Sequence, residues 1–475
     1  MSLTSALSNA GSGLAVAARS AELVATNVAN SLTEGYGRRE IQLTTSNLGG
    51  DTVGVRVAGV DRVVDQVAIT QRRLSESEFA GAQSQADFFR SMESLFGTPD
   101  QPNSLSALIS NLESELVLGA ATPSSTPQLT SIISAAQNLT ELINDGASGI
   151  QELREQADRE ISGDVETLND ALQNIHELNS RIGVQASTGG DVAGLMDQRQ
   201  SLIDQISPLV PMREIARENG RIALVTTNGT ILLDDKPAKF EFTPTYTITP
   251  ELSVAEGTLS GLTIVGAGSS VGSAADAISG GGLSAKFSVR DDLAVQSQVD
   301  LDNFARELIE KTSDPRVDPS LAGGPGLFSD SDSAFDALNS VGLAERISVN
   351  SAILSEPWKL RDGAGVALPG PSGDPTILSA LSSALSGNPE FASNERSVFS
   401  DAVEIVSNSG SQRSQFEKRE AFFGSQVLSF QTTERMSGVD TDQEMQKLLS
   451  IEQAYAANAR VIQTIDELMQ TLLRL

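Results

Sequence analysis

The sequence contains no cysteine, one histidine and one tryptophan, and aromatic residues make up only 4% of its 475 residues. The absence of cysteine excludes disulfide bonds and thiolate metal sites. A core with few aromatic rings has to be built from Leu, Ile, Val and Ala, which suits long packed helices. Hydrophobic residues make up 39% of the chain, so it is globular rather than disordered. Its length allows about two to four domains.

Basic residues are also scarce. The chain has 33 Lys and Arg against 62 Asp and Glu, which gives a formal net charge of −29. A field of this sign favours solubility and repels the phosphates of nucleic acids and anionic lipids, so we expect no nucleic acid and no membrane as partner. No run is long and apolar enough to span a bilayer, and no N-terminal secretory signal is recognisable. An exported protein of this sequence would therefore need a route without the usual cleaved signal.

Motifs for catalysis, metals and cofactors are lacking as well. His176 lies beside an apolar seam on a charged helical stretch without a partner motif, so we interpret it as a solvent-flanking residue. Asp330, Asp332 and Asp336 resemble the start of a calcium loop, but the positions that need Gly and a final Glu hold other residues. The Gly-x-Gly pair at Gly266 has its third glycine out of register for dinucleotide binding. We expect no catalytic residue, no metal and no cofactor.

The first 30 residues carry an unbroken heptad pattern of apolar residues. Spacings of four and three alternate along Leu3, Leu7, Ala10, Leu14, Ala17, Ala21, Val24 and Val28. The only charged residues in this stretch are Arg19 and Glu22, so small neutral side chains cover the rest of the helix. Gly11 and Gly13 each lower helix stability by about 1 kcal/mol relative to Ala. The pattern predicts a helix that orders on assembly; an ordinary amphipathic helix packed on its own domain is the alternative.

The last 35 residues predict a matching helix with a wider apolar face. Thr441 is the expected N-cap, with Glu444 completing a capping box. One heptad seam consists of Ile451, Tyr455, Asn458, Ile462, Ile465, Met469 and Leu472, and an overlapping seam consists of Ala454, Asn458, Val461, Ile465, Leu468, Leu472 and Leu475. Two seams that share residues can contact more than one helix. Asn458 lies where the seams cross and is a candidate for fixing their register.

Between the ends, helical spacing gives way to strand patterns and then returns. Residues 127–184 predict a long helix with Thr126 as N-cap and Pro127 at the first position, and Leu195 to Ile206 predict a second helix. From Pro208 apolar and polar residues alternate, with Asn-Gly turns at 219–220 and 228–229 that predict hairpins. Helical spacing returns at Val289 and again over 396–436, 314–326 predict a loop, and 330–395 give no clear pattern.

These patterns predict a mainly α fold with an all-β insertion. The terminal helices pair as a coiled coil, a long helical bundle forms the core, and the β-rich part is an outer domain. The predicted divisions are a terminal coiled-coil domain of 1–30 with 441–475, a helical core domain of 31–207 with 283–440, and a β-rich insertion domain of 208–282.

Several short motifs resemble the axial proteins of the bacterial flagellum. The first runs from Asn27 and Asn30 into a Thr-x-Gly-Tyr-x-Arg turn with Gly35, Tyr36 and Arg38, although Glu34 replaces the usual proline. The stretches 437–445 and 455–462 resemble the matching C-terminal signature. A third motif contains Asp197, Gln198 and Arg199 and precedes the predicted hairpins, as in the hook-associated protein 1 family. The resemblance covers most of the chain and is weakest over 330–395.

The resemblance implies a structural protein of the junction layer between hook and filament. Members of this family are exported unfolded through the flagellar type III channel, and they polymerise at the distal end of the extracellular flagellum. The implied partners are copies of the chain in a tubular layer, hook protein and the second junction protein as axial neighbours, and an export chaperone at the C-terminal helix. Pairing of the terminal helices would involve Leu3, Leu7, Leu14, Val24, Val28, Ile451, Tyr455, Asn458, Ile462, Ile465, Leu468, Met469 and Leu472.

Three alternatives stay open at this point. Another axial protein, such as hook protein or flagellin, shares the terminal signatures, although the Asp-Gln-Arg helix before a β insertion argues against it. An enzyme in the β-rich insertion would need a catalytic cluster, and no such cluster is recognisable between Pro208 and Gly282. A type III effector or adhesin is the third possibility, but such proteins seldom carry paired terminal heptads.

Overall fold

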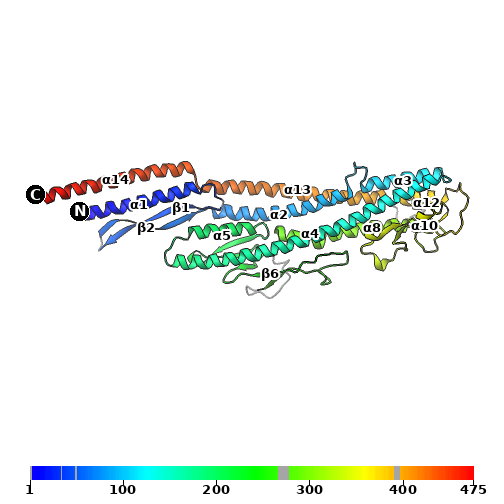
Figure 1. Ribbon diagram of the computed structural model, residues 1–475, viewed down its shortest axis with the longest axis horizontal. Coiled ribbons are helices and arrows are strands. Elements are labelled where there is room, and N and C mark those ends of the chain that lie inside the picture. The colour runs from blue at the N-terminus through cyan, green and yellow to red at the C-terminus, as the bar shows by residue number, and fades with distance from the viewer. Residues whose placement is uncertain (1–2, 34, 49–50, 266–277, 390–395, 475) are drawn as a thin grey trace.

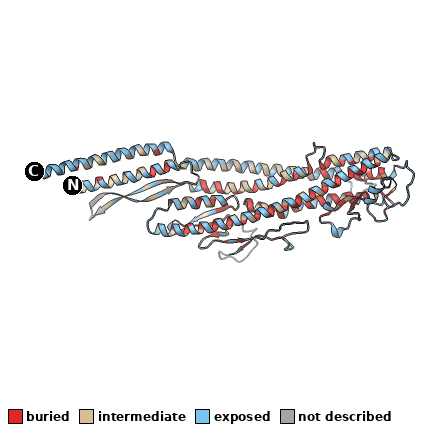
Figure 2. Cartoon of the chain, viewed as in Figure 1, coloured by how far each residue is buried: buried red, intermediate tan, exposed pale blue. Residues whose placement is uncertain are grey.

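The protein is a long rod with both ends of the chain at the same end of the molecule (Figure 1). The computed structural model describes residues 3–33, 35–48, 51–265, 278–389 and 396–474. Buried residues concentrate in the helical body, whereas the terminal helices are largely exposed (Figure 2). The predicted fold class, mainly α with a β insertion, is confirmed.

The terminal part consists of two long helices and a hairpin. Helix α1 (Leu3–Ala29) lies antiparallel to α14 (Thr441–Arg474), and strands β1 (Arg38–Leu48) and β2 (Asp51–Val63) form an antiparallel hairpin beside α1. This hairpin was not predicted from the sequence, and its residues fall in the predicted helical core domain, 31–207 with 283–440. Its signal is a short alternation of apolar residues, Ile41 with Leu43 and Val55 with Val57, which the stronger heptad patterns on either side overshadowed.

A second antiparallel helix pair continues the rod. Helices α2 (Gln66–Phe96) and α13 (Val398–Ser437) pack along their length, and the ion pair of Arg72 with Glu434 at one end and that of Arg90 with Glu417 further along give their register. The 62-residue helix α4 (Thr126–Ser187) runs beside them. Its N-cap is Ser125, whose hydroxyl accepts from the Gln128 amide, so the prediction of Thr126 was one residue late.

Two hydrophobic clusters form the core of the body. The larger one joins α2 and α4 to helices α3 (Leu105–Ala121), α8 (Ala294–Thr312) and α12 (Thr376–Leu385). It also includes residues of short elements in the segment 328–362 that the sequence left unassigned: β8 (Phe328–Asp330), α9 (Leu343–Arg346), β9 (Ile347–Val349), α10 (Ser351–Ser355) and α11 (Lys359–Asp362). The turn η3 (Ala337–Asn339) of the same segment has no buried residue. Neither cluster includes a residue of α1 or α14.

The smaller cluster lies under the β-rich insertion. It joins the second half of α4 and α5 (Ala193–Ile206) to a three-stranded antiparallel sheet of β3 (Met212–Ala216), β4 (Ile222–Thr226) and β5 (Ile231–Leu233). Asn219 and Gly220, in the turn η1 (Glu218–Gly220), both have positive φ, as the predicted Asn-Gly hairpin requires. Strands β6 (Lys239–Glu241) and β7 (Thr263–Val265) form a second small sheet. Gly266 lies outside the described residues.

The insertion is held to the helical body by buried arginines. After α7 (Gly281–Ser288), a π-helical turn η2 (Val289–Leu293) carries Arg290, which is fully buried and bonded to Asp158 of α4. Arg154 of α4 donates to the carbonyl oxygens of Thr249 and Leu252 in the insertion. Because an unpaired buried charge is strongly destabilising, these bonds fix the insertion on α4.

Candidate assembly site at the paired termini

The pairing of α1 with α14 brings together helices that are more than 400 residues apart in sequence. Asn27 bonds to Glu444 at one end of the contact, and Gly13 faces Asn458 further along. A Cβ built on Gly13 would lie 2.8 Å from Nδ2 of Asn458, so the Asn458 side chain would have to shift to admit any larger residue. Gly13, which lowers the intrinsic stability of the helix, thus has a packing role.

The predicted seam residues of α1 are buried to different degrees. Val24 is buried, as are Ala10 and Ala17 of the same heptad pattern. Leu3, Leu14 and Val28 are half-buried, and Leu7 is 45% exposed. The alanines thus bring the helix backbones close, while the leucine at position 7 keeps nearly half of its surface in solvent.

On α14 the two predicted seams have different environments. Ile465 is buried, and Ile451, Asn458 and Ile462 are half-buried. Six other seam residues keep a large part of their side chains in solvent: Ala454, Tyr455, Val461, Leu468, Met469 and Leu472. One α1 helix therefore covers only part of the wide apolar face.

The base of the helix pair contains a polar network around Asn27, which is 1% exposed. Its Nδ2 donates to the Arg39 carbonyl and to Glu444 Oε2, both at 3.0 Å. Its Oδ1 accepts from the Arg39 amide at 3.0 Å and from the Tyr36 hydroxyl at 2.8 Å. A buried amide with all four bonds made holds its neighbours in one arrangement. We call Asn27, Tyr36, Arg39, Arg62, Asp197 and Glu444 the base network.

Glu444 has a different role from the one the sequence predicted. The N-cap of α14 is Asp440, whose Oδ1 accepts from the amides of Asp442 and Gln443, so the predicted capping box at Thr441 is wrong. The Glu444 carboxylate is 1% exposed and accepts from Asn27 and from Lys447 at 2.8 Å. A long-range acceptor role between two helices leaves no trace in local spacing, so the sequence could not indicate it.

Asp197 connects the base network to the body. From α5 it accepts from the Gly37 amide at 3.1 Å, from Arg39 Nη2 at 3.0 Å and from Arg62 Nε at 2.6 Å. The Arg39 guanidinium lies over the Tyr36 ring, 5.0 Å from its centre. Burial raises the pKa of Tyr36 above its ordinary value, so its phenol stays protonated and donates to Asn27 at neutral pH.

The other signature residues lie on both sides of this network. Asn30 directly follows the last residue of α1 and its Nδ2 donates to the Thr26 carbonyl, and Gly35 has a φ of +77°. Arg38 pairs with Glu40 at 2.7 Å on the first hairpin strand. Glu34, the residue before Gly35 in the sequence, lies outside the described residues.

The Asp-Gln-Arg motif divides into three environments. Arg199, on the same helix as Asp197, is buried and donates to Asn179 Oδ1 and to the Gly220 carbonyl, both at 2.8 Å. Burial lowers its pKa to about 10, so it remains charged at neutral pH. Gln198, between them, is exposed. The motif thus ties α5 to the terminal part on one side and to the β insertion on the other.

A second ionic cluster below the base network was not predicted. Arg72 is bound by Glu76, by Asp204 of α5 at 2.8 Å and by Glu434 of α13 at 2.6 Å. These opposite charges raise its pKa although burial opposes the change. Arg73 also pairs with Asp204. The signal available in the sequence was two adjacent arginines in an acidic chain, which does not reveal their partners.

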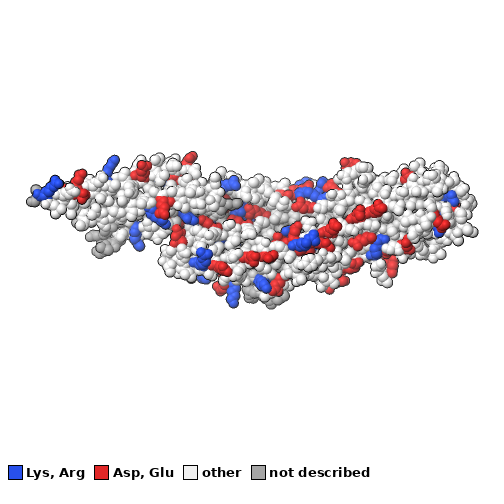
Figure 3. Space-filling view, in the orientation of Figure 1, with Lys and Arg blue, Asp and Glu red and all other residues white. Residues whose placement is uncertain are grey.

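The acidic residues that suggest a cation site in the sequence have protein partners within the described ranges. No group of three or more His, Asp or Glu there could hold a metal ion. Asp330 pairs with Arg346, Asp332 accepts from the Ser351 amide, and Asp336 caps a short helix. Among the helices of the described chain, none combines the length and apolarity that crossing a membrane requires. Charged side chains of both signs are spread over the body and along the terminal end (Figure 3).

Comparison with known families identifies two parts of the chain. Residues 89–314 match the family model of the flagellar hook-associated protein FlgK helical domain. Residues 431–475, which include α14, match that of the flagellar basal body rod FlgEFG protein C-terminal region. Fold, paired termini and both matches define an axial structural protein of the bacterial flagellum.

Individual relatives narrow the assignment. Flagellar hook-associated protein 1 of Bacillus subtilis is 22% identical over 94% of both chains. The proteins of that name from Salmonella typhimurium and Escherichia coli are 23% and 22% identical over 50% of this chain and 44% of theirs. The chain is thus similar to flagellar hook-associated protein 1 along nearly its whole length. A solved structure of the flagellar hook junction protein FlgK from Burkholderia pseudomallei aligns with a TM-score of 0.46 and 17% identity, over 55% of this chain and 46% of that one.

Proposed function

We propose that this chain forms the junction layer between hook and filament, with copies of itself side by side in a tube that the α1–α14 pairs line. The observation that carries the proposal is the half-covered apolar face of α14. Val461, Leu468 and Leu472 are 45%, 49% and 59% exposed beside a paired helix. A face of this width matches a second helical neighbour.

The neighbour that fits this face best is the terminal pair of another copy. When copies are arranged around a tube, the outer side of α1 in one copy faces α14 of the next copy. This side of α1 consists mostly of small neutral residues, among them Gly11, Ala15 and Ala18. Few charged groups lose their hydration in such a contact. The free energy gained by burying apolar surface is therefore not offset by a desolvation cost. Hook protein and the second junction protein are the proposed axial neighbours.

Export and chaperone binding complete the proposal. The chain travels unfolded through the flagellar type III channel to the extracellular flagellum, and an export chaperone covers the apolar face of α14 beforehand. The absence of cysteine supports this route, because no disulfide has to form after export. The exposed leucines of α14 would otherwise promote aggregation before assembly.

The test is filament joining in a motile host that lacks its own junction protein. The intact chain should restore filaments, and versions without residues 1–30 or without 441–475 should not. The double variant Val461→Ser, Leu468→Ser should lose joining while the isolated protein keeps its helical content, because both side chains are already exposed.

The matched control is Leu368→Ser, which changes a leucine that is 78% exposed in a loop of the body. It should join filaments like the unchanged chain. Joining that survives the loss of either terminus, or equal loss in the control, would contradict the proposal.

A further inference from the structure

We propose that Asp197 is a positioning residue for assembly: it fixes the direction in which the terminal helix pair leaves the body, and the base network is where that pair begins to order. This inference rests on the proposed function. It assigns a separate role to a side chain that belongs to the body and touches neither apolar seam.

Asp197 is placed to hold the whole terminal part through one carboxylate. Its three donors, the Gly37 amide, Arg39 Nη2 and Arg62 Nε, all belong to the turn after α1 or to the hairpin. Arg62 also donates to the Gly35 carbonyl and pairs with Gln200 on the same helix as Asp197. Charge-assisted bonds of this kind are stronger and more directional than neutral ones.

From Arg39 the connection reaches both terminal helices. The Arg39 backbone exchanges two hydrogen bonds with the Asn27 side chain of α1, and Asn27 donates to Glu444 of α14. Asp197, Arg39, Asn27 and Glu444 therefore form one continuous series of contacts from the body to the pair. Turning the pair relative to α5 would break charge-assisted bonds within this series.

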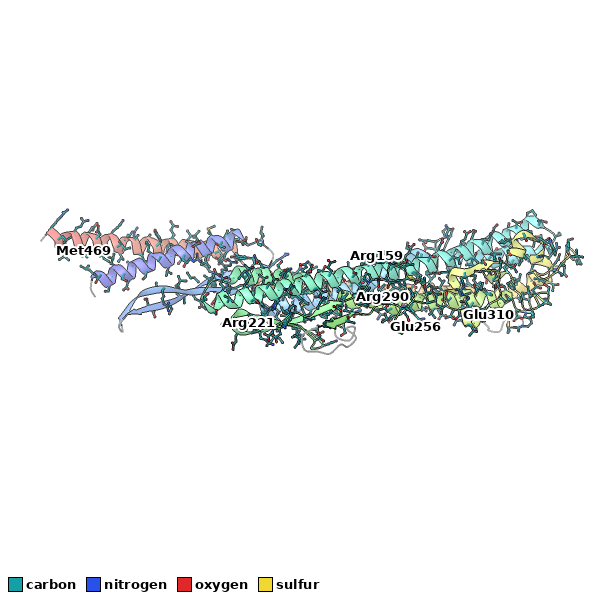
Figure 4. All side chains as sticks on the ribbon, turned by 60° about the horizontal axis from the view of Figure 1, so that its bottom comes forward. Arg159, Arg221, Glu256, Arg290, Glu310 and Met469 are labelled. Carbon is teal, nitrogen blue, oxygen red and sulfur yellow. The ribbon has the colours of Figure 1, made fainter. Side chains whose placement is uncertain are left out.

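Burial is high at the base of the pair, is found again at Ala10 and Ile465, and is low over the last turn of α14. Near the base, Leu23, Val24 and Asn27 of α1 and Glu444 of α14 are at most 7% exposed. Near the free end Leu473 is 83% exposed, and Met469, at 44%, is labelled in Figure 4 near the tip. Segments with little buried area unfold first. The base of the pair therefore stays folded, and the tip becomes ordered only on contact with neighbouring copies.

A cavity lies beside the two segments that connect the terminal pair to the body. Because of it, the direction of the pair relative to the body has to be fixed by a particular residue. The cavity measures about 610 Å³ and is lined by both connections to the pair, with Leu32 and Tyr36 on one and Gly438 and Val439 on the other. Leu32 is 98% exposed, so it anchors nothing. Apolar packing is sparse where these segments connect the pair to the body. The hydrogen bonds to Asp197 therefore fix the orientation of the pair relative to the body.

The experiment measures the distance between the base of the pair and the body in the full-length protein. Because the chain has no cysteine, cysteines placed at the exposed Ala25 of α1 and Glu166 of α4 take two spin labels specifically. The unchanged chain should give one narrow distance distribution. Asp197→Asn should lose that single maximum, and Asp197→Glu, which keeps the carboxylate, should restore it.

Gln198→Asn is the matched control, because it changes the exposed neighbour on the same helix. It should keep the narrow distribution. The inference is overturned if Asp197→Asn keeps the narrow distribution, if the control broadens equally, or if Asp197→Asn lowers the melting temperature of the body, which would make the residue merely structural.

Filament joining by the same variants separates this inference from the proposed function. Asp197→Asn should reduce joining and Gln198→Asn should not; undiminished joining with a broadened distance overturns the positioning role. If the unchanged chain itself fails to join filaments while the distances behave as expected, the proposed function fails and the constraint by Asp197 stands.

Discussion

At the residue scale, we expect the carboxyl group of Asp401 to make the stability of the fold depend on pH. Asp401, near the start of α13, faces Glu307 and Lys311 of α8 as well as Arg396. Burial and the neighbouring Glu307 carboxyl raise the pKa of Asp401 to about 6. Its pKa is thus higher in the folded than in the unfolded chain, so its stabilising contribution is full below the unfolded value and is lost as pH rises through about 6.

The variant Asp401→Asn should therefore gain stability relative to the unchanged chain as pH rises from about 4 to about 7.5. The gain should be on the order of 1 kcal/mol, because the group is only partly buried and Arg396 offsets part of the cost. Chemical denaturation at both pH values measures it. A constant difference between the two chains would show that Asp401 titrates normally.

At the element scale, the close approach of α1 and α14 depends on the position of each glycine. Gly13→Ala favours the helix by about 1 kcal/mol but forces a Cβ against the Asn458 amide, which overpacking data put at about 1–3 kcal/mol. The pair should therefore weaken. Gly11→Ala meets nothing within 4 Å and should only strengthen the helix.

Hydrogen exchange of amides in α1 and α14 distinguishes these two outcomes. Protection should fall in Gly13→Ala and rise in Gly11→Ala, although both substitutions are identical in chemistry. Equal changes in both variants would mean that helix propensity alone governs the pair, and that the contact with Asn458 has no energetic weight.

At the scale of the whole molecule, we expect the body to keep its fold without the terminal pair. Neither hydrophobic cluster of the body contains a residue of α1 or α14. Removal of residues 441–475 should therefore shift the melting temperature of the body by no more than about 4 °C. The same truncation should abolish the protection of α1 amides, because Asn27 loses Glu444. Thermal unfolding and hydrogen exchange on one sample measure both, and loss of the cooperative body transition would contradict the separation.

The amino-acid sequence by itself determined the features that depend on local periodicity. The heptads of α1 and α14, the long α4 and the Asn-Gly turn at Asn219 follow from neighbours a few residues apart, which the chain order specifies. The short motifs containing Asn27, Tyr36 and Asp197 were recognisable for the same reason. Both predicted helix starts were one residue late. Ser125 and Asp440 are the caps where Thr126 and Thr441 were expected, because adjacent residues of similar type compete for one capping position.

Only the tertiary structure decided what those motifs do. Asn27, Asp197 and Glu444 lie far apart in sequence and meet only when α1, α5 and α14 converge at the base of the pair. Hydrogen bonding between distant side chains leaves no period in the sequence, so neither the base network nor the Arg72 cluster could be predicted. The same holds for the division of the α14 face into a part covered by α1 and a part open to a neighbour, because burial depends on what packs nearby and not on the order of residues.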